Sequence, residues 1–108
     1  MVLPESFPKF SPDDACLDNH SPFDILLGRD KAMFNHSGNR RFRAIVNHNV
    51  YEHSTAKRKS AKTALVKRVY ADMKEAGFQF LKKDGSFWKP LDDTEAKAKF
   101  SHVLAFII

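Results

Sequence analysis

The residues best able to do chemistry in this sequence are basic side chains concentrated in its middle third. Residues 29–70 contain eleven lysines and arginines against two acidic residues, Asp30 and Glu52, which gives the segment a net charge of +9. Such a block of positive charge is typical of a surface that binds an anionic partner, most often nucleic acid. A solvated basic surface without a partner is the alternative interpretation of the same pattern.

Three arginines, Arg40, Arg41 and Arg43, fall on the first turn of a predicted helix. The N-terminus of a helix is the positive end of its dipole, so three cations there repel it. A bound phosphate would relieve this repulsion and accept hydrogen bonds from the free backbone N–H groups. Ion pairs between these arginines and acidic residues elsewhere in the chain are the alternative.

Polar residues beside the arginines extend the candidate site. Asn and Arg side chains read adenine and guanine edges in the DNA major groove, which predicts contacts from Asn35, His36 and Asn39. The alternative is that this Asn/His/Ser/Gly run forms a structured turn that fixes the start of the helix. The predicted nucleic-acid-binding residues are Arg29, Lys31, Asn35, His36, Asn39, Arg40, Arg41, Arg43, Lys57, Arg58, Lys59 and Lys62.

Catalytic and metal chemistry have little support in the sequence. Cys16 is surrounded by aspartates, which disfavour a reactive thiolate. No nucleophile elbow, Walker loop or dinucleotide-binding fingerprint is present. His48 and His53 are five residues apart on a predicted helix and therefore diverge, and histidines alone rarely make a structural zinc site. We expect no enzymatic activity, no metal and no cofactor.

The length of 108 residues suits a single domain. Four prolines and several acidic residues make residues 1–22 a predicted flexible acidic arm, and residues 23–108 form the predicted domain. The single cysteine, the absence of a signal-peptide pattern and the short apolar runs predict an intracellular protein that does not enter a membrane.

The elements that must position the candidate site follow from hydrophobic periodicity. Residues 23–28 predict a short strand, and a helix follows from Arg40 with Ser37 or Asn39 as its N-cap. A polar joint at residues 52–60 leads into a second helix, which Gly77 ends.

Two aromatic-rich runs around Asp84-Gly85 predict a β-hairpin with those two residues at the centre of its turn. Phe78, Phe80, Phe87 and Trp88 could stack on bases, although burial in the core is the favoured interpretation. Lys82, Lys83 and Lys89 could contact phosphates as a wing does. A last helix is predicted from Asp92 or Asp93.

The predicted fold class is therefore α+β: a small single domain of three main helices and an antiparallel hairpin, with a third short strand as an option. A winged-helix-like arrangement is the alternative.

Two runs resemble a known family: Asp24-Ile25-Leu26-Leu27-Gly28-Arg29 and Asn35-His36-Ser37-Gly38-Asn39-Arg40-Arg41-Phe42-Arg43. The family is a domain of unknown function abundant in diatoms and other stramenopile algae. Later matches are residues 57–62, 77–81, Trp88 and 96–101. Asp30 stands where the family usually has Gly and adds a negative charge to the proposed anion site. The resemblance implies a nuclear or regulatory protein and brings no assigned activity.

Together these observations predict a DNA-binding domain of a nuclear regulatory protein, with double-stranded DNA as the partner. The basic face would be formed by the 29–43 and 57–68 segments. The alternative is a protein-interaction module that recognises an acidic or phosphorylated partner.

Overall fold

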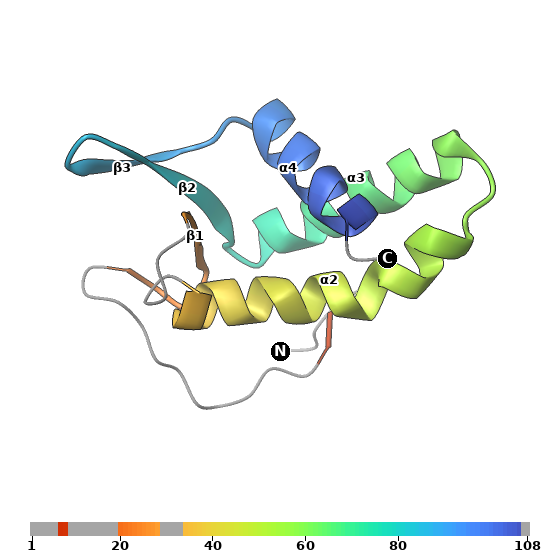
Figure 1. Cartoon of the computed structure of the whole chain (residues 1–108), viewed down its shortest axis with the longest axis horizontal. Helices are drawn as coiled ribbons and strands as arrows, with labels where there is room; N and C mark the ends of the chain where they lie inside the picture. Colours follow the sequence, from red (N-terminus) through yellow and green to blue (C-terminus); the bar gives the residue numbers. More distant parts are fainter. Residues whose placement is uncertain (1–6, 9–19, 29–33, 107–108) are drawn as a thin grey trace.

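The computed structural model describes residues 7–8, 20–28 and 34–106 (Figure 1). Arg29, Lys31 and most of the predicted arm lie outside the described residues. The elements in chain order are β1 (Asp24–Leu27), α2 (Ser37–Thr55), α3 (Lys59–Glu75), β2 (Gln79–Asp84), β3 (Phe87–Pro90) and α4 (Asp93–Phe106). The predicted α+β fold class is confirmed.

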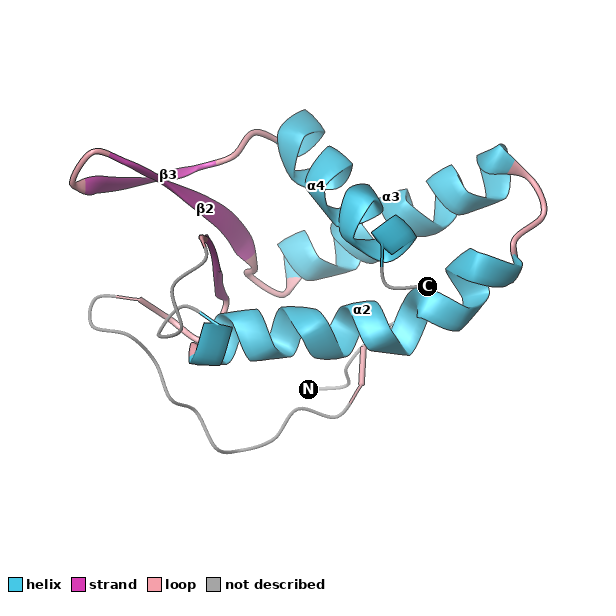
Figure 2. Cartoon of the chain, viewed as in Figure 1, coloured by secondary structure: helices cyan, strands magenta, loops and turns pink. Residues whose placement is uncertain are grey.

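The three strands form one mixed sheet in the order β1-β2-β3 (Figure 2). β1 pairs with β2 in parallel, with Asp24 opposite Gln79 and Leu27 opposite Lys82. β2 and β3 form the predicted antiparallel hairpin. The optional third strand is therefore present. It runs parallel to β2 because α2 and α3 together form the crossover that parallel neighbours require.

The hairpin turn lies one residue later than predicted. Asp84 pairs with Phe87, so Gly85 and Ser86 make the two-residue loop instead of Asp84 and Gly85. Gly85 has a φ of +63°, which glycine adopts without the steric penalty of a side chain. Asp84 remains in the strand, where its carboxylate pairs with Lys89 across the hairpin at 3.0 Å.

The apolar faces of the three helices meet the sheet in one core. Phe42 of α2 links the layers, since its ring centroid lies 5.2 Å from that of Phe80 in β2 and 5.9 Å from that of Phe100 in α4. Phe78 and Phe80 are buried there, as favoured, whereas Phe87 is 73% exposed. The core cluster consists of Phe7, Ile25, Phe42, Ile45, Val46, Leu65, Val66, Val69, Met73, Phe78, Phe80, Ala96, Phe100 and Leu104.

The first helix starts earlier than predicted. α2 begins at Ser37, three residues before Arg40, and its N-cap is His36, which makes no side-chain capping hydrogen bond. Neither predicted cap has that role: Ser37 and Asn39 both lie inside the helix. The Asn39 side chain is bound to β1 instead.

The end of α3 and the start of α4 lie where the sequence indicates, but the joint before α3 is shorter than the predicted 52–60, because α2 continues to Thr55 and α3 begins at Lys59. Gly77 follows α3 with a φ of +100°, the left-handed conformation expected after a helix. The Asp92 carboxylate accepts a hydrogen bond from the Glu95 backbone N–H at 2.8 Å and caps α4.

α2 and α3 run in opposite directions and are joined at the end of the molecule far from the sheet (Figure 1). α4 packs against both of them. At its start, Asp93 pairs with Lys74 of α3 at 2.8 Å and accepts a hydrogen bond from the Tyr70 hydroxyl at 2.8 Å. Of the helices described, none is both long enough and apolar enough to cross a membrane.

Candidate functional site

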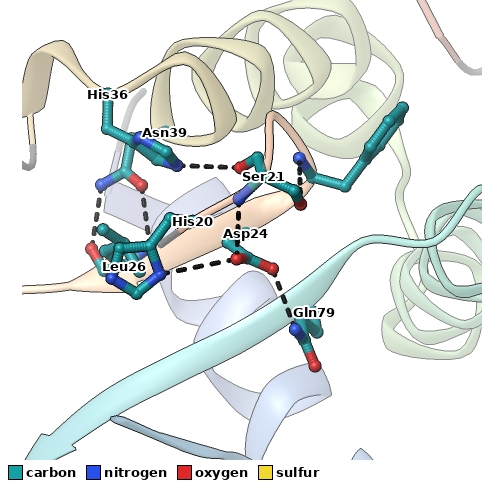
Figure 3. Close-up of polar contacts among 8 residues, drawn as sticks. His20, Ser21, Asp24, Leu26, His36, Asn39 and Gln79 are labelled. Atoms are coloured by element: carbon teal, nitrogen blue, oxygen red, sulfur yellow. Dashed lines mark hydrogen bonds and ion pairs between the residues drawn. The ribbon is translucent and has the colours of Figure 1, made fainter. Parts of the chain in front are cut away.

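The start of α2 is bound to the edge of the sheet through Asn39. Its carboxamide oxygen accepts a hydrogen bond from the Leu26 backbone N–H at 2.8 Å, and its N–H donates to the Leu26 carbonyl at 2.9 Å (Figure 3). A neighbouring strand would make the same two bonds. Because β1 is an outer strand of the sheet, Asn39 closes part of its free edge.

Two residues close to Asn39 in the chain complete this contact. His36 is only 1% exposed, and its Nε2 lies 3.0 Å from the Ser21 carbonyl oxygen (Figure 3). That nitrogen must donate, because a carbonyl only accepts. Gly38 lies so close to β1 that a Cβ would overlap the carbonyl oxygen of Asp24. Glycine is therefore required there by close backbone approach.

Asp24 connects β1 to the residues before it and to β2. Its carboxylate accepts hydrogen bonds from the Ser21 backbone N–H at 3.0 Å and the Gln79 side chain at 2.9 Å (Figure 3). Burial alone would raise the pKa of Asp24, but the hydrogen bonds from Gln79 and Ser21, together with the neighbouring His20, outweigh burial and lower this pKa. The cluster of Asp24, His36, Gly38 and Asn39, the strand–helix clamp, thus fixes α2 against the sheet.

The contacts of the clamp distinguish between the two predictions made for His36 and Asn39, which are base contact and a structured turn. Both side chains are bound to backbone groups of the domain, which favours the structured-turn alternative over contact with base edges. Asn35, which precedes the helix, is exposed.

Because α2 begins at Ser37, Arg41 and Arg43 lie on its second turn instead of on the first turn, where the sequence predicts them, and both pack on aromatic rings. The Arg41 guanidinium lies 5.1 Å from the Phe23 ring centroid. The Arg43 guanidinium lies 3.7 Å from that of Phe34 and donates to the Phe34 carbonyl at 2.8 Å. Burial, together with the charge of Arg40, lowers the pKa of Arg43. All three arginines are half-buried, so they form a cationic group held against the domain, the clamp arginines.

The second basic group lies at the joint between α2 and α3. Lys57, Arg58 and Lys59 are exposed, and Lys62 follows one turn later. Glu52 is the only acidic residue between positions 34 and 70, and it is bound by Arg68 at 3.1 Å. Among the described residues no carboxylate pairs with any of these four cations.

α2 separates the two groups. At a rise of 1.5 Å per residue, Arg40 and Thr55 lie about 22 Å apart along the helix axis. The clamp arginines sit at the sheet end of α2 and the joint lies at its other end (Figure 1). The structure therefore does not bring those predicted residues that it describes into one continuous face.

Two further lysines extend the joint group. Lys67 lies two turns beyond Lys59 on α3, and Lys97 of α4 lines the same groove as Lys67. The sequence places Lys67 in the basic 57–68 segment but not among the predicted site residues. Lys97 carries no signal in the sequence, because its position depends on how α4 packs on α3.

The fold and this geometry define a small α+β domain with a clamp at one end of its longest helix and a strongly cationic surface at the other. The chain belongs to the family described as Domain of unknown function (DUF6824), which matches residues 24–106, from β1 to α4. The family resemblance seen in the sequence is thereby confirmed. No curated protein and no solved structure matches the chain.

Proposed function

We propose that the domain binds double-stranded DNA through the cationic surface at the α2–α3 joint, formed by Lys57, Arg58, Lys59, Lys62 and Lys67 and called the joint surface. One observation carries the proposal: five cations lie within eleven residues, and among the described residues none is paired with a carboxylate. In contrast, Arg68, Lys74 and Lys89 each pair with an acidic side chain.

The hairpin supports DNA binding less well than the joint surface does. Lys82, Lys83 and Lys89 share their part of the surface with Asp84 and Glu95. The acidic side chains offset the local positive charge, so a phosphate backbone is attracted more weakly there. The joint surface has no such offset within the described residues.

The proposed biological role is that of a nuclear regulatory protein that acts on transcription. DNA as the partner supports the nucleus as the place of action. A target sequence is not part of the proposal, because backbone contacts position a protein on DNA without reading bases.

Titration of a fluorescent 20-base-pair duplex at several salt concentrations tests this function. Neutralisation of about five phosphates predicts a log K against log salt slope of about −4 to −5. The double variant Lys57→Glu/Lys59→Glu should lower the affinity by more than about tenfold. Lys82→Glu/Lys83→Glu, with the same charge change on the hairpin, is the matched control and should have a much smaller effect.

An acidic peptide, such as a poly-glutamate 20-mer, distinguishes DNA from an acidic protein partner. Duplex binding that resists competition by this peptide supports the proposal. Binding of the peptide without binding of the duplex would contradict it, as would duplex affinity that does not depend on salt.

A further inference from the structure

A groove between α3 and α4 lies beside the joint surface. It is an open groove with a volume of about 280 Å³ and is lined by both helices. α3 contributes Thr63, Val66 and Lys67, which lie three and four residues apart on one face. α4 contributes a matching face that includes Lys97, Ala98 and Ser101.

The polar lining of the groove suits an anion. Lys67 and Lys97 provide two ammonium groups, and no acidic side chain lines the groove. Within the described part of the chain, the hydroxyls of Thr94 and Ser101 are bound to no other protein group and can donate. Thr63 instead donates its hydroxyl to the Lys59 carbonyl at 3.0 Å, so it offers only its lone pairs.

The carboxylate one turn before Lys97 on α4 is engaged elsewhere. This is Asp93, which pairs with Lys74 and accepts a hydrogen bond from Tyr70. These contacts lower the pKa of Asp93, with the Lys74 hydrogen bond as the main cause, so the carboxylate stays ionised and bound at neutral pH. Asp93 therefore forms its ion pair with Lys74 and not with Lys97, and Lys97 lines the groove.

The floor of the groove is apolar. Val66 of α3 is 6% exposed and lies at the bottom of the groove, and the exposed Ala98 of α4 also lines it. A free inorganic anion would leave this floor uncovered. A phosphate that carries a sugar would place its charge between the lysines and its carbon-bound hydrogens on the floor, which buries apolar surface.

The groove is also continuous with the joint surface. Lys59, Thr63 and Lys67 recur every four residues and therefore lie on one side of α3. Lys59 and Lys67 are about 12 Å apart along the helix axis. A strand that contacts the joint surface can follow this side of α3 into the groove.

From this geometry we infer that the α3–α4 groove seats one phosphate of the DNA backbone together with its sugar, with Lys67 and Lys97 on either side of the phosphate. The inference rests on the proposed function, and it adds to the joint surface a contact from Lys97, which lies outside the basic segment of the sequence.

Position 98 tests the groove without any change in charge. Ala98→Phe fills the groove and should weaken binding of the 20-base-pair duplex by about tenfold, with the salt slope reduced by about 1. Ala98→Ser leaves the groove open and should bind as the parent does. Circular dichroism and the Tm of both variants establish that the fold is retained.

Charge and hydroxyl variants separate the two kinds of contact. Lys97→Gln should weaken duplex binding by about threefold to tenfold and reduce the salt slope by about 1, while Lys83→Gln on the hairpin changes neither. Ser101→Ala should weaken binding by a smaller factor and leave the slope unchanged, because no charge is removed.

Failure of the inference can be told from failure of the proposed function. If Lys57→Glu/Lys59→Glu abolishes duplex binding while Ala98→Phe and Lys97→Gln bind as the parent does, the groove assignment is overturned and the proposed function stands. If the parent does not bind duplex at all, both are overturned. If Ala98→Phe removes only binding of the acidic peptide, the groove belongs to a protein partner and the assignment is overturned.

Discussion

The two ends of α2 carry similar charge in very different surroundings. At the sheet end, Arg41 and Arg43 pack on aromatic rings beside the hydrogen-bonded strand–helix clamp. At the joint end, Lys57, Arg58 and Lys59 project into solvent without carboxylate partners in the described chain. A run of basic residues in a sequence therefore does not define one surface. The contacts of each cation decide whether it holds the fold or remains available to a ligand.

The clamp should be the most sensitive part of the molecule, and Gly38→Ala tests this. The added Cβ overlaps the Asp24 carbonyl, so α2 and β1 must move apart, at a cost of about 3 kcal/mol in the free energy of unfolding. Gly85→Ala at the hairpin turn is the control: no atom lies within 4 Å of its Cβ, and only the positive φ costs about 1 kcal/mol. Urea denaturation measures both, and equal losses would contradict the close-approach explanation.

Removal of the Asn39 side chain should cause the second-largest loss of stability. Asn39→Ala leaves the Leu26 N–H and C=O without these partners and should cost about 2 kcal/mol of stability. Asn47→Ala, on the exposed side of the same helix, should cost less than about 0.5 kcal/mol. Duplex affinity should be unchanged in both, since neither residue belongs to the joint surface. A large loss of affinity in folded Asn39→Ala would move the binding site to the clamp.

Each end of α2 also buries one histidine, and this makes stability depend on pH at both ends. Burial lowers the pKa of His36 and of His53, with the charge of Lys62 adding to the effect at His53. As the pH falls, these histidines therefore take up protons at a higher pH in the unfolded chain than in the folded one. The free energy of unfolding keeps its full value above about pH 6.5 and decreases below it. The decrease is at most about 1.4 kcal/mol per pH unit for each histidine. Urea denaturation between pH 5 and 8 measures the fall. A profile that is flat below pH 6.5 would contradict the assignment.

The smallest effects are expected from single-cation variants, one at each end of α2. Arg41→Gln removes the contact with Phe23 and should cost about 1 kcal/mol of stability or less, with no change in duplex affinity. Lys59→Gln should leave stability unchanged and weaken duplex binding by about threefold to tenfold. The opposite pattern would reverse the roles of the clamp arginines and the joint surface.

Periodicity and turn chemistry predicted most of the fold. The apolar stripe at Phe42, Ile45 and Val46, the helix stop at Gly77 and the hairpin near Gly85 all depend on local preferences, which a sequence displays directly. The parallel pairing of β1 was not predictable in this way, because it follows from where two helices return the chain. The start of α2 was misplaced for a related reason: Asn39 meets a strand thirteen residues away instead of its own helix end.

The candidate site was predicted less well than the fold. The charge block identified Lys57, Arg58, Lys59 and Lys62, but the separation of this group from the clamp arginines needed the length of α2. Lys97 could not be found from the sequence, because it joins Lys67 only through the packing of α4 on α3.

The Asn39 contact has a consequence for self-association. A sheet of three strands has two open margins, and each exposes backbone groups to which a foreign strand can add. Here the Asn39 side chain occupies part of one margin, at Leu26, and the other margin ends in Pro90, which lacks an N–H. Removal of the amide at position 39 would do more than loosen the domain: it would offer neighbouring copies a template, and aggregation should accompany unfolding.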